Sequence, residues 1–401
     1  MANNNNTKNL NVPTLRFPEF KGEWKKKHLS ELVGDIKDRI STSSLSVDNY
    51  VSTENILQNF QGVTLATSLP HNTNVTAFRK DDILFSNIRP YLKKIWYASY
   101  DGGCSTDVFV FRNSGMCSAM FLYHLIANDK FINYVMLGTK GTKMPRGDKQ
   151  QIIQYVVYLP SKLEQNKIAT FLSLLDSRIE AQIKIIEDLK LLKKTMSQNI
   201  FSLKIRFKDE EGNVFSSWKL RKLSDVLIIQ GGYAFKSSLF NQGTNKVIRI
   251  GDILPIIKLS NFSGIYSSET PNEKYIVSKN DFVMALSGAT FGKVGKIEDK
   301  GIAYINQRVA TFRTKQCLEF FYQLVQINNF KNYISSIPTA SAQPNISNDD
   351  IGNYKSYTPD VIEQTKIAGF LSTIDKKIAT ERAILDAYAK QKQYLLANLF
   401  I

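Results

Sequence analysis

A 43-residue segment occurs twice in this 401-residue chain, at an offset of 199 residues. Residues 159–201 and 358–400 align without a gap and share 15 identities. A chain that repeats itself at half its length is expected to fold as two similar units, each carrying one copy of the repeated segment. The repeat therefore constrains the architecture more than any single motif does.

Both copies begin with the signature of a helix N-terminus. Ser161 precedes Glu164 by three residues, and Asp360 precedes Glu363 by the same spacing. In a capping box the first side chain accepts an early backbone N–H of the helix, and the Glu reaches back to the cap residue. Each repeated segment is thus predicted to be a helix that starts just after a proline.

An apolar stripe with the alternating four- and three-residue spacing of a coiled-coil seam runs along both helices. The seam positions are Ile168, Leu172, Leu175, Ile179, Ile186, Leu189, Met196 and Ile200 in the first copy, and Ile367, Leu371, Ile374, Ile378, Leu385, Tyr388, Leu395 and Leu399 in the second. Polar residues interrupt the seam at the matching positions Gln182 and Glu381, and at Lys193 and Lys392. Polar seam positions fix register and partner orientation.

Neither helix can bury its stripe alone, so the simplest solution packs the two together. Forty-three helical residues span roughly 60 Å. Two similar units related by a local two-fold axis would place the helices antiparallel, with the globular domains at opposite ends. The alternative is that both are core helices of one large domain, which leaves the constant offset unexplained.

We predict an α+β fold with a pseudo-two-fold internal repeat, in which two strand-rich globular domains are separated by two long helices packed as an antiparallel coiled coil. The predicted segments are a first domain at 1–158, a helix at 159–203, a second domain at 204–357 and a helix at 358–401. Short apolar runs between polar turns predict the strands, and 117–137 is predicted to be helical. Between a few landmarks the two domains differ almost entirely in sequence.

The chain carries 52 Lys and Arg residues against 36 Asp and Glu residues, a net charge of +16. The two helical segments account for +2 and +1, which leaves +13 for the rest of the chain. A basic balance of this size favours a polyanionic partner, nucleic acid first. Basic domains joined by nearly neutral helices indicate two nucleic-acid readers on a spacer.

Several candidate contact segments combine basic side chains with turn residues that let a backbone approach phosphate. In the first domain the candidate DNA-binding residues are Arg89, Lys93, Lys94, Lys140, Thr142, Lys143 and Arg146. In the second they are Tyr233, Phe235, Lys236, Ser287, Thr290, Lys293, Arg308, Gln343 and Asn345. Any one of them can instead be an ordinary residue of a solvated loop.

Motifs for catalysis are not found. No two prolines are adjacent, so the Pro-Pro-aromatic loop of an amino-methylating enzyme is missing. The run from Gly288 to Lys293 is one residue short of a P-loop and lacks the hydroxyl that would hold magnesium. His28, His71 and His124 show no metal-ligand spacing. We expect no catalytic centre and no metal site in this chain.

The three cysteines are too few for a disulfide framework. No apolar run approaches the length of about 18 residues that a membrane span requires. The expected setting is the cytoplasm, without a membrane partner.

The two E-Q-x-K-I-A-x-F-L-S…D segments, at Glu164–Asp176 and Glu363–Asp375, resemble the DNA specificity subunit of type I restriction–modification enzymes. The stretch from Arg16 to Trp24 is also similar to the start of that family. The resemblance covers the chain from about Leu15 to Ile401. It implies two target-recognition domains, each reading one half of a bipartite site in double-stranded DNA, with the helices acting as a ruler. The divergence between the two domains predicts that the half-sites differ, so that the target is asymmetric.

The resemblance also implies partners. Two methyltransferase subunits would dock and modify adenines with S-adenosylmethionine, and two motor–nuclease subunits would use ATP and Mg²⁺, while the chain itself would hold no cofactor. The residues expected to serve docking or helix pairing are Glu164, Gln165, Lys167, Phe171, Asp176, Glu363, Gln364, Lys366, Phe370 and Asp375. An autonomous bivalent DNA-binding protein and a non-enzymatic scaffold remain the alternatives.

Overall fold

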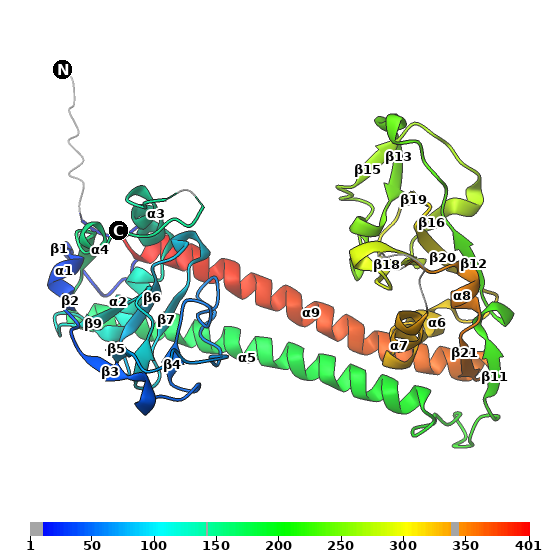
Figure 1. Ribbon diagram of the computed structural model, residues 1–401, viewed down its shortest axis with the longest axis horizontal. Helices are drawn as coiled ribbons and strands as arrows, with labels where there is room; N and C mark the ends of the chain where they lie inside the picture. The colour runs from blue at the N-terminus through cyan, green and yellow to red at the C-terminus, as the bar shows by residue number, and fades with distance from the viewer. Residues whose placement is uncertain (1–10, 142, 338–344) are drawn as a thin grey trace. The chain divides into compact units, whose positions relative to one another are not determined.

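The computed structural model describes residues 11–141, 143–337 and 345–401. The chain divides into two compact units. Unit 1 runs to Lys184 and includes Ala383–Ile401, whereas unit 2 comprises Ile185–Arg382. Each unit therefore contains a part of both long helices, α5 (Lys162–Phe201) and α9 (Val361–Leu399) (Figure 1).

Unit 1 holds two four-stranded sheets and a short ribbon. The first sheet is antiparallel, in the order β2 (Val33–Gly34), β9 (Val108–Asn113), β6 (Ile83–Ser86) and β7 (Ile95–Tyr97). The second has the order β3 (Arg39–Ser41), β5 (Asn74–Phe78), β8 (Gly102–Cys104) and β4 (Tyr50–Val51), with β4 parallel to β8. The ribbon pairs β1 (Lys25–His28) with β10 (Val156–Leu159).

The shorter helices of unit 1 are α1 (Leu29–Leu32), α2 (Ala119–Ile126), α3 (Asp129–Leu137) and α4 (Lys149–Ile152). The prediction of one helix at 117–137 is wrong, because the structure has two separate helices there, α2 and α3. Asn128 lies between them and caps α3, its side chain accepting the backbone N–H of Lys130 at 2.9 Å. The same side chain donates to the carbonyl of Leu396 at 2.9 Å, which ties this break to α9.

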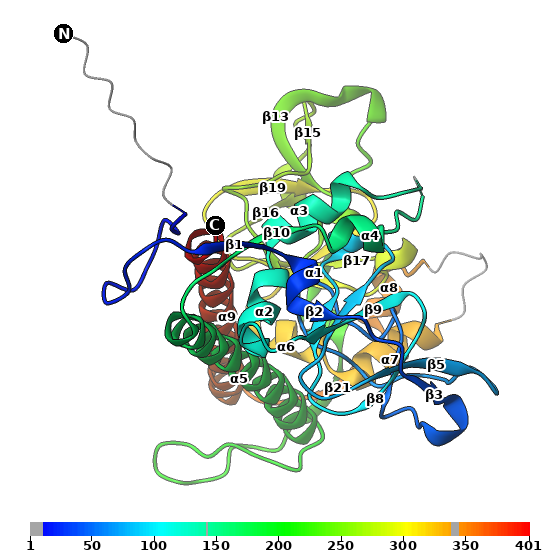
Figure 2. The same cartoon turned by 90° about the vertical axis from the view of Figure 1, so that its left-hand side faces the viewer.

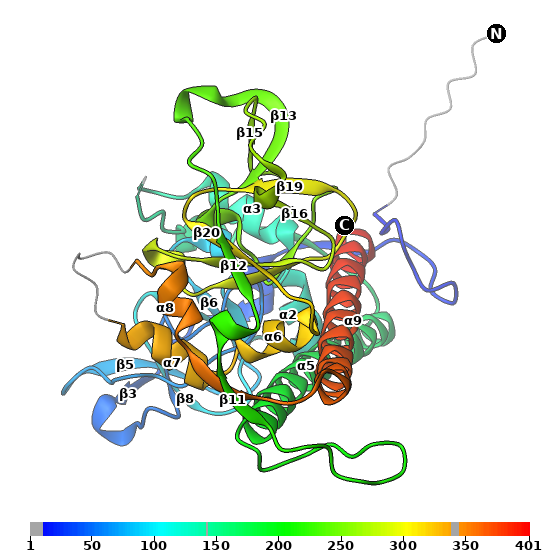
Figure 3. The same cartoon turned by 90° about the vertical axis from the view of Figure 1, so that its right-hand side faces the viewer.

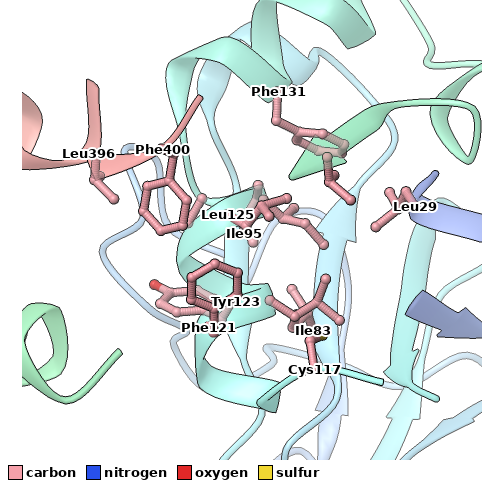
Figure 4. Packing of buried hydrophobic residues seen from close by; sticks show 14 of the residues in the cluster. Leu29, Ile83, Ile95, Cys117, Phe121, Tyr123, Leu125, Phe131, Leu396 and Phe400 are labelled. Atoms are coloured by element: carbon pink, nitrogen blue, oxygen red, sulfur yellow. The ribbon is translucent and has the colours of Figure 1, made fainter. Parts of the chain in front are cut away.

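The main core of unit 1 lies where α2 and α3 meet the first sheet and the two long helices (Figure 2). Phe121 of α2 is fully buried and its ring lies 5.3 Å from that of Phe400, which directly follows α9. Figure 4 shows Leu396 and Phe400 facing Phe121 and Leu125 across this core. The end of α9 is thus an integral part of unit 1.

Unit 2 repeats most of this scaffold (Figure 3). Its five-stranded sheet has the order β12 (Ile228–Gly231), β20 (Val309–Arg313), β17 (Phe282–Ala285), β18 (Val294–Ile297) and β14 (Ile256–Ile257). The four-stranded sheet has the order β15 (Ile265–Ser267), β13 (Phe240–Ile248), β19 (Ile302–Ile305) and β16 (Ile276–Ser278), with β13 parallel to β19. The ribbon pairs β11 (Lys219–Lys222) with β21 (Lys355–Thr358).

The helices of unit 2 are α6 (Leu318–Leu324), α7 (Asn328–Ser336) and α8 (Asn348–Gly352), besides its parts of α5 and α9. These three and β17, β18 and β21 follow their counterparts in unit 1 at the offset of 199 residues. The two domains, which differ almost entirely in sequence, therefore share one framework. β14 and the pairing of β15 with β13 have no counterpart among the described strands of unit 1, and the pairing of β3 with β5 has none among those of unit 2.

The long helices pair antiparallel, as the repeat predicted. The start of α5 shares a core with the end of α9 in unit 1, and the end of α5 shares a core with the start of α9 in unit 2. The predicted seam interruptions Gln182 and Glu381 are 7% and 6% exposed. The domain boundaries drawn from the sequence remain a prediction.

Candidate nucleic-acid interface

The carboxylate of Glu164, at the start of α5, forms a buried cluster with the side chains of Arg16 and Trp24. It is 1% exposed and accepts hydrogen bonds from Arg16 Nε at 2.7 Å and Nη2 at 2.8 Å, and from the Trp24 indole at 3.3 Å. This bidentate, charge-assisted pairing holds residues 11–24 against α5. The capping box is therefore half formed: Ser161 Oγ accepts the backbone N–H of Glu164 at 3.3 Å, but the carboxylate serves Arg16 and Trp24.

Glu363 forms the same cluster at the start of α9. Its fully buried carboxylate accepts from Arg206 Nε at 3.0 Å and Nη2 at 2.9 Å, and from the Trp218 indole at 2.8 Å. Asp360 Oδ1 accepts the backbone N–H of Glu363 at 2.9 Å. Two equivalent clusters thus fix the segment that precedes each domain onto the long helix that follows the same domain.

Sequence reasoning missed the role of Arg16 and Arg206 in these clusters. The sequence does contain a signal for this role, because an Arg-Phe pair precedes Trp24 and another precedes Trp218. The second copy has four more residues between the pair and the Trp, so the offsets are 190 and 194 instead of 199. A gap-free comparison cannot align both ends of this segment.

Gln165 and Gln364 make equivalent contacts one residue further along. The side chain of Gln165 accepts the backbone N–H of Ser118 at 2.9 Å and donates to the carbonyl of Pro160 at 3.0 Å. That of Gln364 accepts from the backbone N–H of Cys317 at 3.3 Å and donates to the carbonyl of Pro359 at 3.0 Å. Both glutamines therefore join a long helix to the N-terminal side of α2 or α6.

Phe171 and Phe370 are each 39% exposed. Their rings make edge contacts with Phe17 at 5.8 Å and with Phe207 at 5.7 Å. Nearby, Lys167 pairs with Glu19, and Lys366 donates to the carbonyl of Lys208 at 3.2 Å. Each Phe side chain thus packs in part inside its own unit and is exposed in part.

Asp176 and Asp375 take the seam lysines as partners. Lys392 Nζ lies 2.5 Å from Asp176, and Lys193 Nζ lies 2.7 Å from Asp375. Burial raises the pKa of Asp176, while Lys392 acts in the opposite direction. Each Asp therefore forms an ion pair that joins α5 to α9.

A third side chain lies beside each of these Asp–Lys pairs, and its residue type differs between the units. His124 of α2 is fully buried with Nδ1 3.9 Å from Asp176, and burial lowers its pKa to about 3. The equivalent residue of unit 2 is Gln323, which donates to Asp375 and to Glu319 at 3.0 Å each. A neutral side chain therefore faces the ion pair in both units.

An open groove of about 470 Å³ lies on the surface of unit 1, between the start of α2 and the first half of α5. Its lining residues include Ser118, Met120, Ala169, Thr170, Ser173 and Leu174. Leu174 is 60% exposed here. The equivalent positions of unit 2 include Glu319 and Thr373, and Glu319 pairs with Lys296.

The two basic segments predicted in the first domain lie side by side. The backbone N–H of Arg89 donates to the carbonyl of Pro145 at 2.8 Å, and Lys140 and Arg146 exchange backbone hydrogen bonds of 3.0 Å. Ile88 bridges to Arg146 in the antiparallel sense. The residues beyond the end of β6 and those before α4 therefore form one basic loop cluster.

The second domain contains the equivalent cluster. Ser287 bridges to Asn345, and these two residues lie 199 positions after Ile88 and Arg146. The N–H of Ile346 donates to the carbonyl of Leu286 at 3.0 Å. On its other side, Arg308 Nη1 donates to Ser287 Oγ at 3.1 Å. These strand-end loops form the candidate nucleic-acid interface of unit 2.

The segment around Tyr233 extends this interface. Tyr233 bridges to Asn306, and its N–H donates to the carbonyl of Ile305 at 2.9 Å. A side chain at Gly232 would meet the carbonyl oxygen of Asn306 at 2.1 Å, so only glycine permits this approach. Glu269 accepts from the Tyr233 hydroxyl at 3.4 Å and from the Lys236 N–H at 2.9 Å.

The candidate DNA-binding residues differ in how exposed their side chains are. Those that are exposed are Arg89, Lys140, Lys143, Arg146, Lys236, Lys293, Arg308 and Asn345. Phe235 and Ser287 are 8% and 1% exposed, so they support the loops from within. Thr290 is half-buried, and its hydroxyl has no hydrogen-bond partner among the described residues. Thr142 and Gln343 lie outside the described residues.

Two lysines of the first segment are held by contacts inside the unit. Lys94 Nζ donates to the carbonyl of Thr53 at 2.6 Å, and burial lowers its pKa. Lys93 pairs with Asp129 at 2.6 Å. Arg146 and Lys140 keep exposed side chains while lying 3.4 Å from Asp107 and 2.8 Å from Asp148. Arg89 and Lys143 have no side-chain partner within the described ranges.

Over residues 11–141, 143–337 and 345–401, no group of three or more His, Cys, Asp and Glu side chains is placed to hold a metal ion. Within the same part of the chain, no helix is both long and apolar enough to cross a membrane.

One framework that occurs twice, each time with loops of exposed basic side chains at the strand ends, defines a protein with two recognition units. Residues 21–190 and 216–387 both match the type I restriction modification DNA specificity domain. The chain belongs to this family, as the sequence resemblance indicated.

Known relatives agree with this assignment. The chain is 28% identical over 305 residues to the type I restriction enzyme MjaVIII specificity subunit of Methanocaldococcus jannaschii, which covers 72% of this chain and 71% of that protein. It is 27% identical over 179 residues to the EcoBI specificity subunit of Escherichia coli, covering 43% and 36%.

Two solved structures share the fold. The S subunit of a type I restriction-modification system from M. genitalium has a TM-score of 0.61 at 16% identity, covering 97% of this chain and 99% of that one. A chain from a study of complex assembly and conformational transition of the type I R-M system has a TM-score of 0.56 at 18% identity, covering 93% and 96%.

Proposed function

We propose that this chain is the DNA-recognition subunit of a type I restriction–modification complex, in which each unit reads one half of a bipartite target in double-stranded DNA. The observation that carries the proposal is that the loops holding Arg89 and Arg146 in unit 1 are equivalent to those holding Lys293 and Asn345 in unit 2. Each set lies on loops that follow or precede the same framework elements.

Such loops suit DNA because they combine two kinds of contact. Exposed Lys and Arg side chains neutralise phosphates and position the protein on the duplex. Arg, Asn and Gln side chains distinguish bases by their hydrogen bonds in the major groove. Because the exposed residues differ between the two units, the two half-sites are expected to differ, which makes the target asymmetric.

The antiparallel helices serve as the ruler between the half-sites. Their length, not base contacts, sets the number of unread base pairs between the two recognised segments. The Lys–Asp pairs and the buried Gln182 and Glu381 support this role, because polar groups inside a seam fix its register.

The helices also dock two methyltransferase subunits in this proposal. The half-exposed rings of Phe171 and Phe370 and the groove beside Leu174 support it, since both lie on the repeated helices. The chain acts without a catalytic centre of its own. Adenine methylation with S-adenosylmethionine, and restriction with ATP and Mg²⁺ by two motor–nuclease subunits, belong to the partners.

The test is single-molecule methylation sequencing of DNA from cells that coexpress this chain with its matching methyltransferase. We expect a new bipartite adenine-methylated motif that is absent without the chain. No new motif, with both proteins folded and copurifying, would favour the scaffold. Specific, tight DNA binding by the chain alone would favour the autonomous DNA-binding protein.

Docking is tested separately by copurification. Leu174→Asp and Phe370→Asp should each reduce recovery of the methyltransferase, because a charge would enter an apolar contact. Leu65→Asp, at a residue that is 66% exposed and far from both helices in sequence, is the matched control. Unchanged recovery with all three variants would contradict docking at these positions.

A further inference from the structure

A turn of unit 1 carries a concentration of strained backbone. Arg89 and Lys93 flank the 3-10 turn η2 (Pro90–Leu92), and both have left-handed φ angles, of 51° and 54°. Asn59 and Phe60 are left-handed too, with φ angles of 56° and 61°. Four of the nine described non-glycine residues with positive φ therefore lie in two adjoining segments.

These segments are joined by the backbone. The N–H of Asn59 donates to the carbonyl of Leu92 at 3.1 Å, and that of Phe60 donates to the carbonyl of Lys93 at 3.0 Å. From the other side, the N–H of Arg89 donates to Pro145 at 2.8 Å. Hydrogen bonds at both ends hold the turn in one conformation.

Unit 2 builds the same turn with glycines. Gly288 and Gly292 occupy the positions of Arg89 and Lys93, with φ angles of 78° and 71°. Leu92 donates to the carbonyl of Arg89 at 2.9 Å, as Phe291 donates to that of Gly288 at 3.0 Å. The framework therefore needs a left-handed backbone at this place but no side chain.

A left-handed conformation costs free energy for an arginine and almost none for a glycine. Backbone strain of this kind persists where the surrounding structure enforces it, and it gathers at functional sites. Lys93 uses its side chain for the ion pair with Asp129. The exposed guanidinium of Arg89 has no partner within the described residues, so the turn presents it to an external ligand.

We propose that Arg89 is a specificity-determining residue that reads a guanine in the half-site of unit 1. This inference rests on the proposed function. A flexible loop suffices for a phosphate contact, because phosphates repeat along the duplex and tolerate shifts of the cation. A bidentate contact with guanine O6 and N7 requires the guanidinium fork at a defined place, and the rigid turn fixes the backbone position from which the Arg89 side chain extends.

The experiment compares Arg89→Gly, Arg89→Ala and Arg89→Lys in the full chain, coexpressed with the methyltransferase, by single-molecule methylation sequencing. All three variants should relax the preference at one guanine by about tenfold or more, since a good bidentate contact discriminates to that extent. The other half-site should be unchanged. The matched control is Asn72→Gly, which alters another exposed left-handed residue of unit 1.

Thermal unfolding separates recognition from folding. Arg89→Gly relieves the strain and should unfold at the same temperature as the wild type or higher, whereas Arg89→Ala keeps the strain and should not exceed the wild type. Loss of guanine preference in a variant as stable as the wild type would establish a role in recognition.

Two negative results have different meanings. A wild-type chain that directs no new motif would overturn the proposed function and this assignment with it. A wild-type motif that Arg89→Gly leaves intact would overturn the assignment alone. Equal weakening at every position, with the motif preserved, would also overturn it, because that pattern identifies a phosphate contact.

Discussion

Lys392 Nζ lies 2.5 Å from a carboxylate oxygen of Asp176, and this ion pair joins α9 to α5 inside unit 1. The side chains are only 13% and 22% exposed. Lys193 and Asp375 repeat the contact in unit 2 at 2.7 Å. The polar interruptions seen in the apolar stripe thus mark the places where the helices are aligned with each other.

Asp176→Asn should lower the free energy of unfolding of unit 1 by about 2 kcal/mol, because it leaves a half-buried ammonium without its charged partner. A double-mutant cycle with Lys392→Met, followed by chemical denaturation, should give a coupling energy of about 1–3 kcal/mol. The exposed pair Lys390 and Asp386 is the control and should couple by less than about 0.5 kcal/mol. Equal coupling for both pairs would contradict a special role for Asp176.

Glu164→Gln should destabilise unit 1 by about 3 kcal/mol, since it removes one partner of a buried bidentate ion pair. Glu363→Gln should have a similar effect on unit 2. Hydrogen–deuterium exchange locates the effect: protection should fall near Arg16 and Trp24 in the first variant, and near Arg206 and Trp218 in the second. A loss of protection in both units in either variant would show that the two clusters do not stabilise their units independently.

These clusters also show which features the sequence could predict. Helix pairing was predictable because the apolar spacing and the repeated Pro, Glu and Lys positions are local features. The contact between Arg16 and Glu164 was not, because 148 residues separate them and the offset changes between copies.

The shared framework was hidden for another physical reason. Ile83 and Phe85 of β6 correspond to Phe282 and Met284 of β17, and all four are buried. Buried strand positions require an apolar side chain of suitable size rather than one residue type. Two sequences with few identities can therefore build the same pairs of neighbouring strands.

The unfolding free energy of unit 1 should depend on the protonation of His124. The pKa of this buried imidazole is about 3, whereas the ordinary value is about 6.5. Between these values the unfolded chain binds more protons, so stability should fall as the pH decreases from about 6.5 toward 3, by up to about 1.4 kcal/mol per pH unit. Denaturation at a series of pH values measures the slope.

His124→Gln should flatten that slope, and Gln is the residue that occupies the equivalent place in unit 2. The exposed His71, replaced by Gln, is the control and should leave the slope as it is. A slope that persists in His124→Gln would assign the pH dependence to other groups.

Arg146→Ala and Lys293→Ala should each weaken DNA binding by the assembled complex. If each side chain neutralises one phosphate, the slope of log K against log salt concentration should decrease in magnitude by about 0.9. Fluorescence anisotropy over a range of salt concentrations measures this slope. Lys390→Ala removes an exposed lysine from α9 and should leave the slope unchanged, whereas an unchanged slope for Arg146→Ala would exclude a phosphate contact there.

Removing one heptad from the middle of α5 together with one from the middle of α9 should shorten the unread gap of the DNA target while both half-sites persist. Seven helical residues measure about 10 Å, which corresponds to about three base pairs at 3.4 Å each. A seven-residue deletion keeps the apolar seam in phase, whereas a four-residue deletion from both helices shifts it and should impair pairing. Methylation sequencing reads the gap directly. A seven-residue deletion that preserves both half-sites and the original gap would show that the helices do not set the spacing.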